Sequence, residues 1–139
     1  MFNEVTAILV AYLGVFIGLL LSKIAKEEVS AGKQNLINLE HLLRLLIIIV
    51  FFVMLPTTIV NKFVVAVILF VLAMFVKKNY YLFGLMLGMN PNFIMSSLVL
   101  IYGFPFGSLM HNHKYSGILK KTWQFLLFAL IGIAVRGFI

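Results

Sequence analysis

Residues 80–110 read YYLFGLMLGMNPNFIMSSLVLIYGFPFGSLM, and these 31 consecutive positions contain no Asp, Glu, Lys or Arg. Such a run is typical of membrane segments, because about 20 apolar residues in a helix span the hydrocarbon core of a bilayer. The run is interrupted by Gly88-Met-Asn-Pro-Asn92, the strongest helix-breaking cluster in the chain. These residues indicate a membrane protein, and the way they divide decides how often the chain crosses the bilayer.

The rest of the chain has the same apolar character. Four further runs lack charged side chains: 5–22, 45–61, 63–76 and 122–135. Of the 139 residues, 63% are hydrophobic and 11% are charged, whereas a soluble domain has about 25% charged residues. We therefore predict an all-α fold, a polytopic integral membrane helical bundle with five to six membrane segments, some short or re-entrant. Residues 1–139 would form a single transmembrane domain, because the connecting segments are too short to hold a soluble one.

The predicted helices follow the uncharged runs. Outside the central run they cover Val5–Ser22, Leu39–Pro56, Phe63–Val76 and Thr122–Val135. Ser30-Ala-Gly-Lys33 is expected to form a turn between the first two helices.

The charged residues are unevenly distributed, with 11 Lys and Arg against four acidic residues and a net charge of +7. The cations lie at the ends of the apolar runs, where anionic lipid headgroups are the natural partner, and no basic face predicts nucleic-acid binding. Short basic loops are retained in the cytoplasm. We therefore expect Lys23–Arg44, Lys77–Lys78 and Lys114–Lys121 inside and both termini outside, in a prokaryotic plasma membrane.

The charge rule bears on the central run. Read as one span, residues 80–110 would place Lys114, Lys120 and Lys121 outside. Read as two spans, Tyr80–Met89 and Phe93–Met110, they return the basic loop His111–Lys121 to the cytoplasm, so six segments are favoured over five. Ten residues are too few to cross about 30 Å of hydrocarbon. The first of these segments must be re-entrant, shielded by neighbouring helices, or extended over residues 79–92.

Three Gly-x-x-x-Gly spacings occur, at Gly14/Gly18, Gly84/Gly88 and Gly103/Gly107. Small residues four apart let membrane helices approach closely. The contact could be within the chain or between subunits. The first and third pairs each precede a Lys-rich segment and another apolar helix, a weak repeat that also favours six segments.

Three further features are candidates for a cavity or a site. Arg44 follows Glu40 by four positions and either forms an interfacial ion pair with it or faces a cavity in the bundle. Asn90-Pro91-Asn92 either forms a turn at the interface or breaks a helix beside a cavity. The same two alternatives hold for a second break at Pro105, between Gly103 and Gly107.

The functional expectation rests mostly on what the chain does not contain. It has no cysteine, and His111 and His113 are only two potential ligands with no carboxylate nearby, so we predict no metal and no cofactor. No nucleophile motif or phosphate-binding loop occurs, so we predict no enzyme. Only Glu40 could place a carboxylate in the membrane, which argues against coupling to Na⁺ or H⁺.

The predicted function is a small non-catalytic integral membrane subunit or scaffold. It would pack against copies of itself or against a larger membrane complex. The alternative is a small oligomeric channel or transporter for an anionic or neutral solute.

Overall fold

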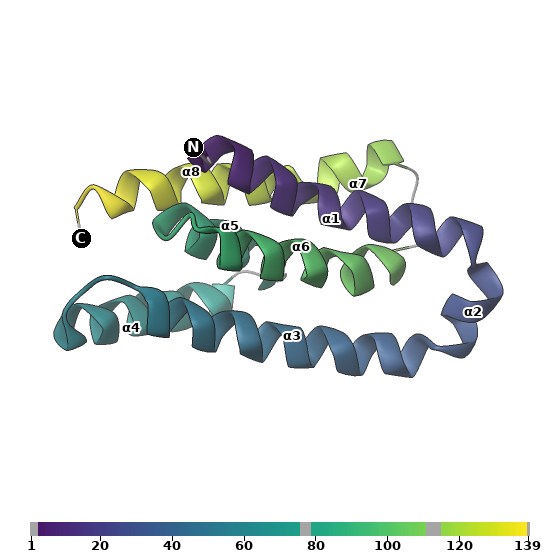
Figure 1. Cartoon of the computed structure of the whole chain (residues 1–139), viewed down its shortest axis with the longest axis horizontal. Helices are drawn as coiled ribbons and strands as arrows, with labels where there is room; N and C mark the ends of the chain where they lie inside the picture. The colour runs from purple at the N-terminus through teal and green to yellow at the C-terminus, as the bar shows by residue number, and fades with distance from the viewer. Residues whose placement is uncertain (1–2, 76–78, 111–114, 139) are drawn as a thin grey trace.

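The computed structural model describes residues 3–75, 79–110 and 115–138. Every regular element in these ranges is a helix (Figure 1). In chain order the helices are α1 (Glu4–Ile24), α2 (Lys26–Ala31), α3 (Lys33–Met54), α4 (Ile59–Phe75), α5 (Asn79–Met89), α6 (Phe93–Ser108), α7 (Tyr115–Thr122) and α8 (Gln124–Arg136). Three stretches are long and apolar enough to cross a membrane: Glu4–Ile24, Lys33–Met54 and Ser116–Arg136. The all-helical class and its membrane character agree with the sequence prediction.

The long helices lie side by side along one axis and give the bundle two distinct ends (Figure 1). At the terminal end, Glu4 at the start of α1 pairs with Arg136 at the end of α8. The turns α3–α4 and α5–α6 lie at this end too, because Leu55, Thr57, Asn90 and Arg136 line one cavity. At the basic end lie α2 and α7 (Figure 1).

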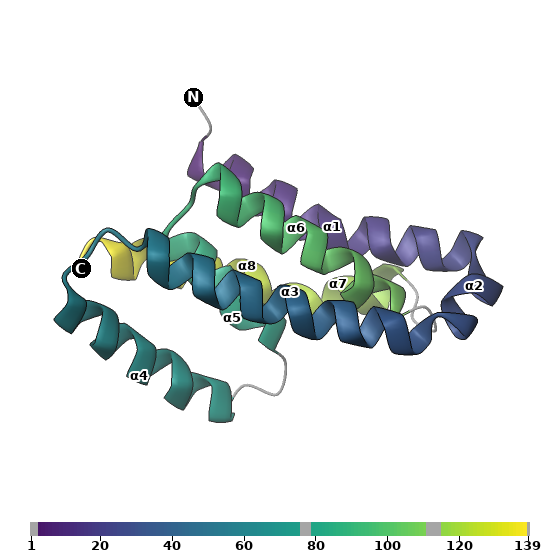
Figure 2. The same cartoon turned by 60° about the horizontal axis from the view of Figure 1, so that its bottom comes forward.

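Helices α1 and α6 are parallel and form the closest pair in the bundle (Figure 2). Ser96 donates a hydrogen bond to the carbonyl oxygen of Ala7 (2.8 Å), and Ser108 donates one to that of Gly18 (3.0 Å). Between these contacts, Gly14 and Gly18 face Gly103 and Gly107, and a β-carbon at any of the four would overlap backbone atoms of the other helix. Two of the three glycine pairs therefore pack against each other within one chain.

Helices α5 and α8 form a second parallel pair. A β-carbon at Gly84 would overlap the carbonyl oxygen of Phe125, and one at Gly88 would overlap that of Ala129. Gly132 of α8 lies at the same crossing and would meet Gly88. The third glycine pair is thus also used inside the chain, and every residue from Tyr80 to Met89 is buried. Neighbouring helices shield this short segment, one of the arrangements that its length allowed.

Helices α3 and α4 cover the remaining side of the bundle. One face of α3 packs on α6 through the buried side chains of Leu43, Ile47 and Phe51. In α4 only Val65 and Leu69 are buried, and Figure 2 shows this helix standing to one side of α3 and α5. The bundle therefore has a glycine-packed core of α1, α5, α6 and α8, with α4 loosely attached outside it.

Several predicted boundaries are wrong. The second long helix begins at Lys33, six positions before Leu39. The predicted turn at residues 30–33 is confirmed only at Gly32, because Ser30 lies in α2. Residues 115–122 form α7 and not a loop. The cause is the same in both places: hydropathy detects the lipid-embedded part of a helix, whereas backbone hydrogen bonding continues into the polar flank.

The predicted break at Pro105 is also wrong. Helix α6 continues through this residue to Ser108, and Pro105 is buried against neighbouring helices. Proline removes one backbone donor, but membrane helices tolerate it where packed neighbours surround the freed carbonyl. The flanking Gly103 and Gly107 let α1 approach closely at this point.

Candidate functional site

Arg44 lies on α3 in a small polar cluster with Glu40 and Tyr102. Its Nη2 donates to Oε1 of Glu40 at 3.0 Å, and the hydroxyl of Tyr102 on α6 donates to the same oxygen at 2.8 Å. The side chains of Arg44 and Glu40 are 27% and 15% exposed. The cluster holds a charged pair at the bundle surface next to α6, with each hydrogen bond assisted by charge.

The same arginine lines a cavity between α3, α4 and α5, which we call the Arg44 cavity. It has a volume of about 280 Å³, larger than the roughly 150 Å³ engineered cavity that admits benzene. The lining consists of Arg44, Ile48, Phe52, Ala66, Leu69, Phe70, Ala73, Leu82, Phe83 and Met86. Among these residues Arg44 alone carries a charge. The ion pair and the cavity, posed as alternatives from sequence, are therefore both present.

Two sequence features create this cavity. Along α3, the face with Leu43, Ile47 and Phe51 packs on α6, which turns Arg44, Ile48 and Phe52 toward α4. The spacing of four places these three residues on one helix stripe. On the opposite wall α4 contributes two of the smallest side chains, Ala66 and Ala73, so space remains between the helices.

Arg44 has one group with no protein partner. Its Nε is buried and makes no hydrogen bond. A buried donor without a partner costs about 1–3 kcal/mol, and more when the group is charged. The guanidinium is therefore held by Glu40 on one side and has hydrogen-bonding capacity left over.

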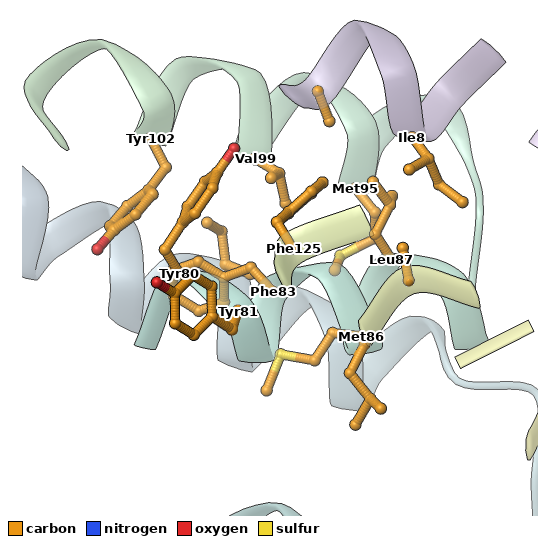
Figure 3. Packing of buried hydrophobic residues seen from close by; sticks show 14 of the residues in the cluster. Ile8, Tyr80, Tyr81, Phe83, Met86, Leu87, Met95, Val99, Tyr102 and Phe125 are labelled. Atoms are coloured by element: carbon orange, nitrogen blue, oxygen red, sulfur yellow. The ribbon is translucent and has the colours of Figure 1, made fainter. Parts of the chain in front are cut away.

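A column of stacked aromatic rings lies next to Tyr102 of the Arg44 cluster. Tyr80 lies between the rings of Phe106 and Phe125, with ring centroids 4.8 and 4.6 Å away, and its hydroxyl is buried with no hydrogen-bond partner. Figure 3 shows Tyr80, Tyr102 and Phe125 gathered in the core. Tyr12 stacks on Phe125 (5.7 Å) and shares a hydrogen bond of 2.8 Å with Thr122. Sequence reasoning missed these tyrosines; the available signal was their position in uncharged runs, where a hydroxyl needs a partner.

Asn90-Pro91-Asn92 separates α5 from α6 at the terminal end. Oδ1 of Asn92 accepts from the backbone nitrogen of Met95 at 2.8 Å and caps α6, while its Nδ2 donates to Oδ1 of Asn90 at 3.2 Å. Protein groups therefore satisfy most of the hydrogen-bonding capacity of Asn92. A cavity of about 190 Å³ lies beside it, lined by Leu55, Pro56, Thr57, Met89, Asn90 and Arg136. In this cavity, Oγ1 of Thr57 and Nδ2 of Asn90 are buried without a protein partner.

The structure separates the predicted site residues into three places. Arg44 lies toward the basic end, and the Asn90–Asn92 turn lies at the terminal end. The glycines and Pro105 lie along the α1–α6 contact and line neither cavity. His111 and His113 are outside the described residues. Within the described ranges, no group of three or more His, Asp or Glu side chains could hold a metal ion.

The chain matches no protein-family model, no curated protein and no solved structure.

Proposed function

We propose that this chain is a small non-catalytic integral membrane subunit whose α3–α4 side packs against a second copy or another membrane protein. The observation that carries the proposal is the use of all three glycine pairs inside the chain. Close-packing surfaces of this kind are the usual sites of helix association in lipid. Since they are occupied internally, a partner must bind elsewhere on the bundle.

Of the apolar helices that the structure describes, α4 has the fewest buried residues. Large apolar side chains on this helix are mostly exposed, among them Ile59 (86%), Phe75 (81%) and Met74 (73%). In lipid an exposed apolar face is permitted, so exposure alone does not demand a partner. The additional feature is that α4 makes few contacts with the rest of the chain. A neighbouring membrane protein could therefore pack on α4 without displacing another helix of this chain.

The proposed threading uses six membrane segments: α1, α3, α4, α5, α6 and α7–α8. Successive segments run in opposite directions, which brings Glu4 and Arg136 together at one end. Lys23, Lys26 and Lys33 lie around α2 at the other end, and Lys120 and Lys121 lie in α7. By the charge rule this basic end is cytoplasmic and both termini are outside, in a prokaryotic plasma membrane.

The absence of catalysis is supported by how the buried hydroxyl groups are used. Ser22, Ser96 and Ser108 each donate to a backbone carbonyl oxygen. Thr122 donates to the carbonyl oxygen of Ile118. A nucleophilic hydroxyl needs a nearby base to take its proton, and none of these bonds provides one.

The second candidate function is a small oligomeric channel or transporter for an anionic or neutral solute. It is favoured by the cavity at the terminal end, whose lining includes the polar residues Thr57, Asn90 and Arg136. Solute flux in proteoliposomes containing the purified chain separates this candidate from a non-catalytic subunit.

The proposal is tested by the native mass of the chain extracted in a mild detergent, combined with disulfide cross-linking. The chain has no cysteine of its own, so a cross-link formed by a single introduced cysteine can be attributed to that position. We expect a mass greater than one chain, with Val67→Cys on α4 cross-linking and Leu130→Cys on the exposed face of α8 failing to do so. A single-chain mass with neither variant cross-linked would contradict the proposal.

A further inference from the structure

The Arg44 cavity has one cationic residue and an otherwise apolar lining, and packing against a protein partner requires neither feature. Arg44 stands at one end of the lining stripe on α3 and Phe52 at the other. The eight-residue separation corresponds to about 12 Å along the helix axis. The cavity is thus charged at one end and apolar along its length.

Arg44 lies near the middle of α3, with a polar flank before it and an uncharged stretch after it. The uncharged run 45–61 begins directly after it, and the preceding residues from Lys33 to Asn38 are mostly polar. A long arginine side chain can extend from within a membrane helix toward the headgroups and hold a phosphate there. The rest of the cavity then extends into the depth where acyl chains lie.

Access to the cavity is from the side of the bundle. Phe70 and Ala73, which line it, are both exposed, and the backbones of α3 and α4 stand apart along almost their whole length. An occupant can therefore enter between these helices from the lipid phase. A small soluble anion would gain nothing from the apolar lining of this cavity.

The chemistry of the guanidinium fits a second anion. Glu40 accepts a hydrogen bond from Nη2, and the arginine lines the cavity. The planar guanidinium has five N–H donors and can bind a carboxylate and a phosphate together. Glu40, itself held by Tyr102 of α6, fixes the orientation of the guanidinium, and the donors that Glu40 does not use remain for a ligand.

We propose that the Arg44 cavity binds an anionic phospholipid, with the phosphate on Arg44 and one acyl chain along Ile48 and Phe52 between α3 and α4. The site is independent of whether α4 also carries a protein partner. If the basic end is cytoplasmic, the lipid comes from the inner leaflet, which is rich in anionic headgroups.

The test measures thermal unfolding of the purified full chain in a mild detergent, titrated with phosphatidylglycerol or phosphatidylcholine. For the wild-type chain we expect a saturable rise in melting temperature with phosphatidylglycerol and a much smaller one with phosphatidylcholine. Arg44→Gln should weaken the apparent affinity for phosphatidylglycerol by about tenfold, roughly the effect of one charge-assisted hydrogen bond. Lys120→Gln is the matched control, because Lys120 is an exposed cation at the same end and does not line the cavity.

A second variant tests the apolar part without touching the charge cluster. Ala73→Leu fills the cavity from α4 and should lower the affinity for phosphatidylglycerol while leaving the melting temperature in detergent alone unchanged or higher. Val71→Phe adds comparable bulk on the exposed face of the same helix and should have no effect on lipid affinity.

Several results would overturn the proposal. One is an Arg44→Gln variant that responds to phosphatidylglycerol as the wild type does. Another is equal stabilisation by phosphatidylcholine, which would indicate an apolar surface that does not recognise charge. Equal stabilisation by inorganic phosphate would show that the acyl chain contributes nothing. A change in oligomer mass with Ala73→Leu, without a change in lipid affinity, would assign the cavity to a helix of a second copy.

Discussion

Helices α4 and α5 follow each other in the chain and are both uncharged over most of their length, yet their surroundings are opposite. The 11-residue α5 is buried from Tyr80 to Met89, whereas the 17-residue α4 buries only Val65 and Leu69. The difference lies in glycine: α5 contains Gly84 and Gly88, which meet α8, and α4 contains none. In lipid, apolar side chains gain little by leaving the solvent, so close approach of small residues decides which helix is buried.

The largest effect should come from placing the same side chain in both helices. Gly88→Leu in α5 would collide with the backbone of Ala129 and Gly132, and we expect a loss near the upper end of the roughly 1–3 kcal/mol that overpacking costs. Val67→Leu in α4 points into open surroundings and should stay within about 0.5 kcal/mol of the wild type. Thermal unfolding in a mild detergent measures both. Equal melting temperatures for the two variants would contradict the conclusion that α5 is tightly packed and α4 is not.

A loss of the same kind is expected at the other glycine contact. Gly18→Leu on α1 and Gly107→Leu on α6 would each overlap backbone atoms of the facing helix, with an expected cost of about 1–3 kcal/mol. Because this contact is internal, the oligomer mass should not change. Ile17→Leu, on the exposed face of α1, is the control. Variants that melt normally but dissociate would show that the glycines form a subunit interface.

The smallest effect should appear where α5 joins α6. Asn92→Ala removes the side chain that caps α6 at Met95, and loss of a cap of this type costs about 1 kcal/mol. Asn90→Ala removes only the acceptor for Asn92 and should cost less, while Asn92→Ser should restore most of the loss. Unfolding curves of the three variants establish the order. A silent Asn92→Ala would mean that water, and not the turn itself, satisfies the start of α6.

The sequence was informative where a local property decides the outcome. The uncharged runs coincide with helices, and the polar cluster at Asn90-Pro91-Asn92 coincides with the turn between α5 and α6. It was uninformative where distant segments meet. The hydrogen bond from Tyr102 to Glu40 joins positions 62 residues apart, and no periodicity in either helix specifies it.

The Arg44 cavity illustrates the same limit. Its existence depends on which face of α3 packs on α6 and on Ala66 and Ala73 lying opposite that arginine. Small side chains in an apolar helix are compatible with a close contact or with an open space. Only the position of the neighbouring helix distinguishes the two, and this position is set by glycines elsewhere in the chain.

The most direct test of the account is the side of the membrane on which α7 lies, because α5 reverses the direction of the chain only if it is a segment of its own. Lys120→Cys and Phe138→Cys place single reporters in α7 and beyond the end of α8, at exposed positions. In intact cells, an impermeant thiol reagent should label Phe138→Cys and leave Lys120→Cys unlabelled until the membrane is permeabilised. Labelling of Lys120→Cys in intact cells would contradict the six-segment bundle and the role assigned to α5.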